Sequence, residues 1–413
     1  MPGDRAQGSS AAADACWKAS CIGKLSGFRV DSDPAPAGWT FLFYAEQCPD
    51  AVLSPSHNRL ASTHMATPSP LGFGIAGVGV IAGFHAQAIT AARGARLVAV
   101  AGRTPEKTRA FAEARGVPFW TTSFDELAAR PEVDVICVCT SSGAHLEPSL
   151  AAARAGKHLV IEKPLEIALE RVDELLRAAD AAGVRVAAIF QGRFGEGART
   201  VKAAIDAGRF GRLVLASAYV KWHRTAQYYT GTRGRRAQDG GGALMNQAIH
   251  AIDLLQWYAG MPAEVHAWTT RRVYQHIEVE DTACASLRFP SGALGTIEAS
   301  TALYPGWQRR LEICGENGAA VLEGDHIARW DFREARSEDD AIRATKDNAA
   351  LGSGASSPTG ITHHGHQRQI QDLIDALRQN RPTAVDGHEG RKAVALVCAL
   401  YESAQRGAPV KLA

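Results

Sequence analysis

The feature that most constrains this chain is a regular alternation of apolar strands and helical stretches between Leu71 and about Phe190. Alternation of this kind, with strands that are apolar throughout, predicts a parallel sheet covered by helices on both faces. We expect strands at 72–76, 96–101, 134–140, 158–162 and 184–190, with helices at 105–114, 146–155 and 166–182.

The pattern changes after residue 191. A helix at 197–207, a strand at 213–222 and a helix at 242–258 precede β-rich runs at 264–274, 281–289, 293–302, 309–314 and 319–323. Gly- and Pro-containing turns separate these runs, so we expect a large, mostly antiparallel open sheet with helices on one face. The polar, Gly- and Ser-rich segment 337–360 is expected to be an exposed excursion, and helices at 366–379 and 388–405 close the chain.

The first 64 residues differ from the rest. They mix Gly, Ser, Ala and Pro with three of the eight cysteines and contain no long periodic run, so we expect a disordered extension. The run from Met65 to Pro70 resembles a natural protein start, and one hypothesis is that translation begins at Met65. The expected organisation is therefore an extension at 1–64, an α/β domain at 65–190 and an α+β domain at 191–413.

Composition excludes several function classes. The 413 residues carry 45 Lys and Arg against 43 Asp and Glu, a net charge of +2 that gives no footprint for a nucleic-acid or anionic-membrane partner. No stretch approaches the 18 consecutive apolar residues of a membrane span. The eight cysteines include no C-x-x-C pair, which favours reduced thiols in the cytoplasm over a zinc or disulfide framework.

A glycine motif follows the first strand. Gly77-Val-Gly79-Val-Ile-Ala82 leads into a helix, in the position where one glycine permits a tight turn and the next lets the backbone approach a pyrophosphate. The free N–H groups and the dipole of a helix amino terminus favour that anion. The motif predicts a dinucleotide site, whereas the alternative is a packing turn in an α/β protein with another ligand.

The end of the second strand bears on the choice of dinucleotide. NAD-selective proteins usually place a carboxylate there for the adenosine ribose, but Gly102 occupies this place. Because Arg103 and Thr104 are able to accommodate a 2′-phosphate, the sequence favours NADP over NAD. The alternative for Arg103 is a solvated side chain that stacks on adenine without discriminating.

Two further segments carry groups suited to chemistry. The strand ending at Glu162 runs into Lys163-Pro164, which puts an ammonium at the carboxyl end of a parallel strand, where ligands bind in such sheets. The glycine run 240–242 leads into a helix on which Asn246 and His250 share one face, with Asp253 expected nearby.

Together these motifs resemble the Gfo/Idh/MocA family, the glucose-fructose oxidoreductase and inositol dehydrogenase group of NAD(P)-dependent enzymes. The resemblance runs from about Leu71 to the C-terminus and rests on the glycine motif with His85, the segment 139–145, Glu162-Lys163-Pro164, and residues 240–250. It implies a Rossmann domain followed by a domain whose open sheet often forms an oligomer interface. It also implies a catalytic pair, Lys163 and His250.

The expected site follows from the motifs and the resemblance. A neutral imidazole suits proton exchange with a substrate hydroxyl, so His250 is the expected general base, and Lys163 would stabilise negative charge on the same oxygen. Many family members carry Asp where this chain has Asn246, which orients a hydroxyl but accepts no proton. The expected cofactor contacts are Gly77, Gly79, Val80, Ile81, Arg103, Thr104, Thr140, Ser141, His145, Glu162, Lys163 and Pro164.

Aromatic and basic residues suggest a substrate class. Aromatic faces stack on sugar rings and Arg binds carboxylates or phosphates bidentately. This composition suits a pyranoside, and an acidic or nucleotide-linked one is a further hypothesis. Expected substrate contacts are Arg193, Trp222, His223, Tyr228, Asn246 and His250. The cluster His363-His364-Gly365-His366 is expected to belong to a loop near the cleft or a helix cap and to bind no metal.

The sequence therefore predicts a cytoplasmic, homo-oligomeric (dimeric or tetrameric) NAD(P)-dependent dehydrogenase or reductase that interconverts a secondary alcohol and a ketone on a sugar, sugar derivative or cyclitol. Two alternatives stay open. One is a non-catalytic regulator that senses a dinucleotide or sugar, against which the presence of Lys163 and His250 argues. The other is a reductase of a non-sugar carbonyl, such as a dihydrodiol- or biliverdin-like compound.

Overall fold

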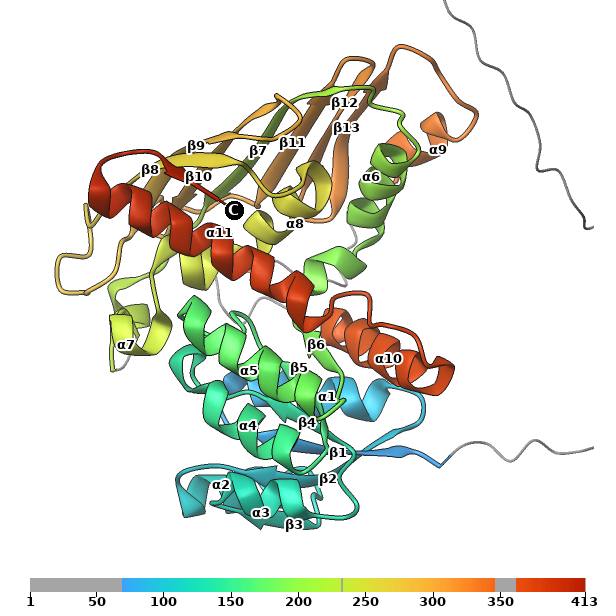
Figure 1. The fold of residues 1–413 in the computed structure, drawn as a ribbon, viewed down its shortest axis with the longest axis vertical. Helices are drawn as coiled ribbons and strands as arrows, with labels where there is room; N and C mark the ends of the chain where they lie inside the picture. Colours follow the sequence, from blue (N-terminus) through green and yellow to red (C-terminus); the bar gives the residue numbers. More distant parts are fainter. Residues whose placement is uncertain (1–68, 232, 346–361, 413) are drawn as a thin grey trace, which may run out of the picture. The chain divides into compact units, whose positions relative to one another are not determined.

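The computed structural model describes residues 69–231, 233–345 and 362–412 (Figure 1). The predicted extension at 1–64 and the hypothesised start at Met65 lie outside these residues. So does most of the predicted excursion at 337–360.

The first sheet is fully parallel, with strand order β3-β2-β1-β4-β5-β6. Alternate residues of its central strand β4 (Val135–Val138) face opposite layers: Ile136 and Val138 pack with α3, α4 and α5, whereas Val135 and Cys137 pack with α1, α2 and α10. The elements are β1 (Leu71–Ala76), α1 (Val80–Ala91), β2 (Ala95–Ala101), α2 (Pro105–Glu113), β3 (Phe119–Thr121), α3 (Phe124–Ala129), β4, η1 (Ser142–Ala144), α4 (Leu146–Arg154), β5 (His158–Ile161), α5 (Leu169–Ala181) and β6 (Val186–Ala188).

The second sheet has eight strands in the order β13-β12-β11-β7-β10-β9-β8-β14, and all neighbours are antiparallel except β7 and β10. The elements that follow β6 along the chain are η2 (Gln191–Phe194), α6 (Glu196–Asp206), β7 (Leu213–Lys221), η3 (Ala226–Tyr229), α7 (Arg236–Asp239), η4 (Ala243–Ala248), α8 (Ile249–Ala259), β8 (Glu264–Thr270), β9 (Thr282–Arg288), β10 (Leu294–Ser300), β11 (Arg310–Gly315), β12 (Gly318–Glu323), β13 (His326–Phe332), α9 (Asp339–Arg343), α10 (His364–Gln379), α11 (Gly387–Arg406) and β14 (Val410–Lys411). The predicted fold class is confirmed: a parallel α/β sheet precedes a mostly antiparallel one.

The two faces of the second sheet differ. One row of paired residues is buried beneath the helices: Ala267, Ala285, Ile297, Ala218, Leu311 and Leu322. The neighbouring row is exposed or half-buried: Trp268, Cys284, Glu298, Tyr219, Arg310 and Glu323. Helices α8 and α11 lie along the buried face (Figure 1). Because side chains alternate across a strand, the period-2 pattern of these runs leaves the other face uncovered.

The last two long helices return to the first sheet. Ile370, Leu373 and Ile374 of α10 pack in the same core as β1 and α1. Helix α11 contacts both α5 and strand β8 of the second sheet. The predicted domain boundary at residue 190 stays a prediction, because chain from beyond it completes the core of the first sheet.

Part of the predicted excursion at 337–360 is folded. Asp339 in α9 is buried, where it accepts hydrogen bonds from Arg209 (2.6 Å to Oδ1) and the Trp330 indole (2.8 Å). The prediction of an exposed segment was wrong at this point, because one buried ion pair anchors an otherwise polar run. No helix within the described ranges is both long and apolar enough to cross a membrane.

Candidate functional site

The glycine turn after β1 leaves open space at the amino terminus of α1. Gly77 has φ +102°, and a Cβ there would lie 2.6 Å from the Cys139 carbonyl oxygen. A Cβ on Gly79 would meet nothing within 4 Å, and no side chain caps the helix. Val80 is 70% exposed. The first glycine is therefore required by close packing, and the helix amino terminus presents bare N–H groups to an anion.

The end of β2 has no room for an acidic side chain. A Cβ on Gly102 would lie 2.5 Å from the Thr108 hydroxyl oxygen and 2.9 Å from a Val78 methyl carbon. Arg103 and Thr104 follow and are exposed.

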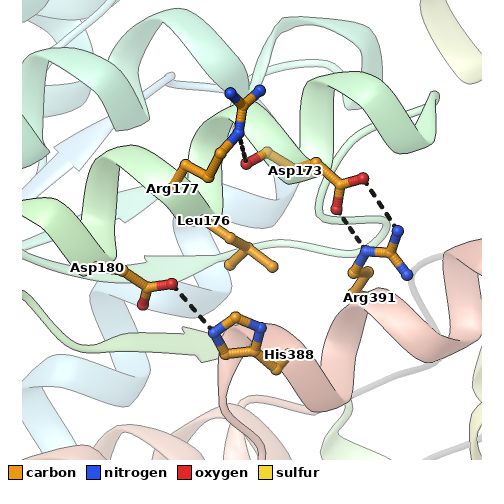
Figure 2. A pocket seen from close by; sticks show the side chains of 6 residues that line it. All are labelled: Asp173, Leu176, Arg177, Asp180, His388 and Arg391. Atoms are coloured by element: carbon orange, nitrogen blue, oxygen red, sulfur yellow. Dashed lines mark hydrogen bonds and ion pairs between the residues drawn. The ribbon is translucent and has the colours of Figure 1, made fainter.

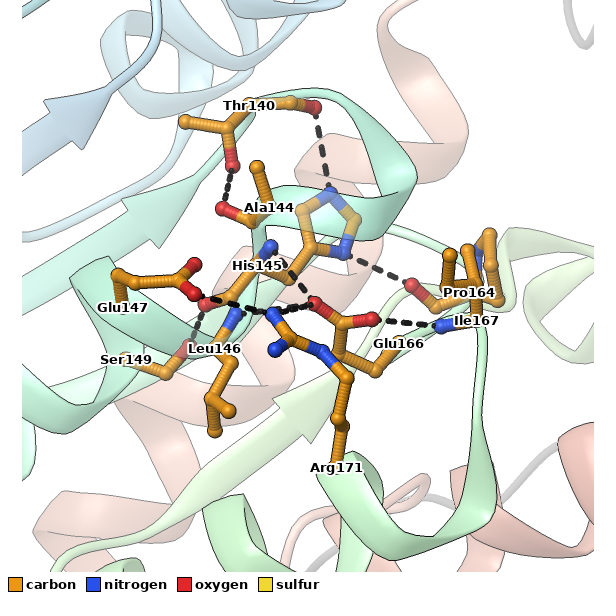
Figure 3. Close-up of polar contacts among 10 residues, drawn as sticks. All are labelled: Thr140, Ala144, His145, Leu146, Glu147, Ser149, Pro164, Glu166, Ile167 and Arg171. Atoms are coloured by element: carbon orange, nitrogen blue, oxygen red, sulfur yellow. Dashed lines mark hydrogen bonds and ion pairs between the residues drawn. The ribbon is translucent and has the colours of Figure 1, made fainter. Parts of the chain in front are cut away.

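The segments after β4 and β5 are tied together by buried polar groups (Figure 3). The His145 ring lies between the carbonyls of Pro164 (2.8 Å from Nδ1) and Thr140 (3.2 Å from Nε2). Burial lowers the pKa of His145, which favours the neutral ring. This side chain is 1% exposed and fixes the two loops, and its contact with a cofactor stays a prediction.

Glu166 fixes the same segments, a role that was not predicted from the sequence. This fully buried carboxylate accepts the backbone N–H groups of His145 (3.2 Å), Leu146 (3.3 Å) and Ile167 (2.7 Å) and pairs with Arg171 at 2.9 Å (Figure 3). It thereby satisfies orphan donors at the start of α4. Only the fold brings residues 145 and 166 together, so no local signal indicated this role.

Glu162 is also buried, and its contact with a cofactor stays a prediction. Its Oε1 accepts hydrogen bonds from His85 Nε2 (2.9 Å) and His366 Nε2 (3.0 Å), and its Oε2 accepts the backbone N–H of Lys163 (3.1 Å). Burial raises the pKa of Glu162, but the bonds from His366 and His85 outweigh it and hold that pKa well below its usual range. The carboxylate is therefore ionised at neutral pH.

Lys163 reaches across to the second domain. Its Nζ donates to the backbone carbonyl of Asn246 at 2.9 Å. Residue 246 lies in η4, a π-helical segment that takes the place of the first turns of the regular helix expected at 242–258. Such segments interrupt the i→i−4 bonding pattern and recur at functional sites. Asn246 therefore positions Lys163 through its backbone, a contact that residue type alone did not predict.

The glycine run before η4 is explained by close packing. A Cβ on Gly241 would lie 1.9 Å from the Tyr401 hydroxyl, and one on Gly242 would lie 1.8 Å from the Glu280 carbonyl oxygen. The Glu280 carboxylate accepts the N–H groups of Gly242 (3.0 Å) and Leu244 (2.9 Å) and the Tyr401 hydroxyl (2.8 Å). Glu280 and Tyr401 thus fix the segment that carries Asn246, and both were missed from sequence.

His250 lies in the first turn of α8, and the Lys163 charge acts on it. Burial lowers the pKa of His250 well below its usual range, and the charges of Lys163 and Arg309 lower it further. Its Nδ1 is buried with no hydrogen-bond partner in the part of the chain that the structure describes. The imidazole is therefore neutral at physiological pH, as a general base requires.

Basic and aromatic groups lie on the substrate side of Lys163. The Tyr228 hydroxyl accepts hydrogen bonds from Arg233 (2.8 Å) and Gln247 (2.8 Å), and Arg224 donates to Gln247 at 2.9 Å. Burial lowers the pKa of Lys163, Glu162 opposes this, and the charges of Arg233 and Arg224 add to the lowering. Charged groups of both signs therefore surround the ammonium, since Glu162 and Asp239 oppose the effect of the two guanidinium groups.

Other predicted substrate contacts differ in their placement. Arg193 is 4% exposed and forms a bidentate ion pair with Asp253 (2.7 and 2.8 Å), and its contact with a substrate stays a prediction. A buried guanidinium needs such a partner. Trp222 is partly buried against the hydrophobic core, and the Arg224 guanidinium lies over its ring. The His223 ring lies edge-on to the Tyr304 ring, with 5.4 Å between the ring centroids.

A surface hollow of about 420 Å³ lies between α5 and α11 and contains none of the predicted site residues (Figure 2). Its charged groups are engaged: Asp173 pairs with Arg391, Asp180 lies 3.3 Å from His388, and Arg177 donates to the Asp173 carbonyl. Both carboxylates of the hollow therefore already face basic side chains.

Comparison with known proteins decides the family. Residues 71–190 match the model of the oxidoreductase family with an NAD-binding Rossmann fold, and residues 198–321 match the GFO/IDH/MocA C-terminal domain. The chain belongs to the Gfo/Idh/MocA family of oxidoreductases. The resemblance drawn from the motifs is thereby confirmed.

Several Gfo/Idh/MocA relatives are similar over much of their length. The 1,5-anhydro-D-fructose reductase of Ensifer adhaerens is 30% identical over 60% of this chain and 74% of its own. The myo-inositol 2-dehydrogenase of Thermotoga maritima is 27% identical over 82% and 98%. The WlbA dehydrogenase of Bordetella pertussis, solved in complex with NADH and UDP-GlcNAcA, is 32% identical with a TM-score of 0.74, over 83% of this chain and 99% of its own.

Proposed function

We propose that this protein is a dinucleotide-dependent oxidoreductase that interconverts a secondary alcohol and a ketone on a sugar, sugar derivative or cyclitol. The observation that carries the proposal is the placement of Lys163 and His250, from two different domains, close enough that the lysine charge depresses the imidazole pKa. Relatives named as inositol dehydrogenase and anhydrofructose reductase support the substrate class.

The residues divide the work as follows. In the oxidation direction, neutral His250 accepts the substrate hydroxyl proton, and it returns a proton in reduction. Lys163 donates a hydrogen bond to the same oxygen and stabilises the negative charge that develops on it. Its bond to the Asn246 carbonyl keeps the ammonium at this position. The bound dinucleotide accepts or supplies the hydride.

The residues at the glycine turn fit a dinucleotide. The open space at Gly79 and the bare start of α1 suit a pyrophosphate. Val80, Ile81, Thr140 and Ser141 border this turn or follow β4 at the same edge of the sheet, where a cofactor of this class lies.

We further propose that NADP is favoured over NAD, since position 102 admits no carboxylate and Arg103 is exposed beside it. Arg103→Ala should lower the ratio of kcat/KM for NADP to that for NAD by about 5–30-fold, the equivalent of about 1–2 kcal/mol. Steady-state rates with each dinucleotide measure this ratio. A wild-type preference for NAD, or an equal loss with both dinucleotides, would contradict an interaction with the 2′-phosphate.

The substrate is proposed to be an anionic sugar. The charges of Arg233 and Arg224 act on Tyr228, opposed by Asp239, and the WlbA complex holds UDP-GlcNAcA. A panel of free sugars, inositols, uronic acids and UDP-sugars, followed at the reduced-nicotinamide absorbance band with both dinucleotides, tests this. We expect turnover with an acidic member of the panel. Turnover restricted to neutral sugars would contradict the charged-substrate proposal.

The same panel separates the alternatives. Bound dinucleotide without turnover of any compound favours a sensing regulator, and turnover only with dihydrodiol- or biliverdin-like carbonyls favours the non-sugar reductase. The buried Nδ1 of His250, which has no partner among the residues that the structure describes, and the ammonium of Lys163 held at the Asn246 carbonyl argue for catalysis, because a sensor needs neither.

We also propose a cytoplasmic homo-oligomer, a dimer or tetramer joined through the uncovered face of the second sheet. Trp268 on that face is 58% exposed, among neighbours of mixed polarity. The five described cysteines are free, which fits a reducing compartment. Light scattering should give the mass of at least two chains, and a monomer at micromolar concentration would count against this assembly.

A further inference from the structure

The group formed by His85, Glu162 and His366, here called the histidine clamp, joins three distant parts of the chain. His85 lies on α1, Glu162 follows β5, and His366 lies in the first turn of α10, 204 residues further on. All three side chains are buried, at 0%, 5% and 1% exposure. The clamp borders the lysine expected to act on substrate, yet the mechanism above does not use it.

A metal ion is one occupant that the residue types allow, since the three ligand atoms lie within 4.8 Å of one another. The hydrogen-bond geometry argues against it. Each Nε2 already lies 2.9 or 3.0 Å from the same carboxylate oxygen, and neither Nδ1 has a partner among the described residues. Metal-bound imidazoles normally donate their second N–H to an acceptor, and none is present here.

The clamp instead acts on Lys163 through the backbone. One oxygen of Glu162 is held by the two imidazoles and the other accepts the Lys163 N–H at 3.1 Å. The Lys163 side chain then reaches the Asn246 carbonyl. Burial favours the neutral form of His85, and a neutral imidazole that donates from Nε2 leaves the carboxylate charge in place. A continuous set of hydrogen bonds therefore runs from α10 to the ammonium.

Helix α10 is itself fixed at this place. Gln369 accepts the Phe190 N–H at 3.0 Å and bonds the Ala188 carbonyl, so it ties α10 to the end of β6. A Cβ on Gly365 would lie 2.9 Å from the Gln191 side chain. Helix α10 therefore packs against the segment that joins the two domains. A displacement of α10 would be passed to Glu162 through His366.

We propose that His366 and His85 are positioning residues that hold Lys163, through Glu162, at the distance its reaction with the substrate oxygen requires. The expected loss of kcat rests on the proposed function, whereas the placement of Lys163 by the clamp does not. Misplacement of a reacting group by about 1 Å costs about 10²-fold in rate. His366→Leu should therefore lower kcat by about 10–100-fold, whereas KM and the dinucleotide Kd change less than about threefold.

Three variants test the clamp. His366→Leu removes the donor, His366→Gln keeps an N–H group, and His364→Leu makes the same change two residues away, at an exposed ring bonded only to Gln367 among the described residues. Hydrogen–deuterium exchange of a peptide that begins several residues before Glu162 and ends at Ile167 reports the Lys163 N–H without any need for turnover. We expect faster exchange and lower kcat in His366→Leu, recovery of both in His366→Gln, and wild-type behaviour in His364→Leu.

Failure of the clamp proposal can be told apart from failure of the proposed function. If no substrate is turned over, the exchange result alone decides the clamp. Exchange at 162–167 that is unchanged in folded His366→Leu would overturn it, as would a stoichiometric metal in the purified protein that is lost with His366. If His366→Leu does not fold, Glu162→Gln is the variant used instead. In one orientation its side-chain amide turns an N–H donor, in place of an oxygen acceptor, toward the Lys163 N–H. Unchanged exchange and unchanged kcat in Glu162→Gln would equally overturn the proposal.

Discussion

Replacing Lys163 by methionine will lower kcat by about 10²–10³-fold, because the ammonium is the group placed to stabilise charge on the reacting oxygen. Methionine keeps most of the side-chain volume but loses the bond to the Asn246 carbonyl. The dinucleotide Kd, measured by nicotinamide fluorescence, should change less than about threefold, since the glycine turn and the start of α1 are untouched.

Lys157→Met is the matched control. Lys157 is also half-buried and also donates to a backbone carbonyl, that of Arg130 at 3.1 Å, but it lies at the opposite end of β5. We expect this variant to keep wild-type kcat. Undiminished turnover in Lys163→Met would remove this lysine from the mechanism.

His250→Asn will lower kcat by about 10²–10⁴-fold, the range for loss of a general base. The pH dependence gives a second signature. Burial holds the pKa of His250 well below its usual range, so the neutral base persists as the pH falls through 6.5. Wild-type oxidation should therefore fall only at pH values below that depressed pKa, where the imidazole gains a proton. The variant should lack this acidic limb.

His326→Asn is the control for this substitution. His326 is half-buried on β13, and its Nδ1, like that of His250, is buried with no partner in the described ranges. It should retain wild-type rate and pH profile. An unchanged profile in His250→Asn would mean that another group exchanges the proton.

The parts of the fold set by local patterns could be predicted from sequence. Five parallel strands and most helices were expected within a few residues, because apolar strands and periodic helices carry strong signals. Strand β3 (Phe119–Thr121) was missed, since three residues give no periodicity. Strand β13 (His326–Phe332) was also missed, because its pairing with β12 and the pair between Trp330 and Asp339 stabilise a polar run.

Prediction of the site had a different limit. Lys163 and His250 were found because each belongs to a motif that reads along the chain. Their supporting groups were not, because the contacts span large sequence separations: His366 lies 204 residues from Glu162, and Tyr401 lies 121 from Glu280. The ion pair of Arg193 was not predicted for the same reason, since its partner Asp253 lies 60 residues away.

The most direct test of the central claim is the absorbance of reduced nicotinamide during turnover of the sugar panel, with wild-type and Lys163→Met protein measured side by side. We predict turnover of at least one sugar or cyclitol by the wild-type protein and its loss in the variant, with the dinucleotide bound equally by both. Equal turnover by both proteins, or dinucleotide binding without turnover by either, would contradict an oxidoreductase that works through Lys163.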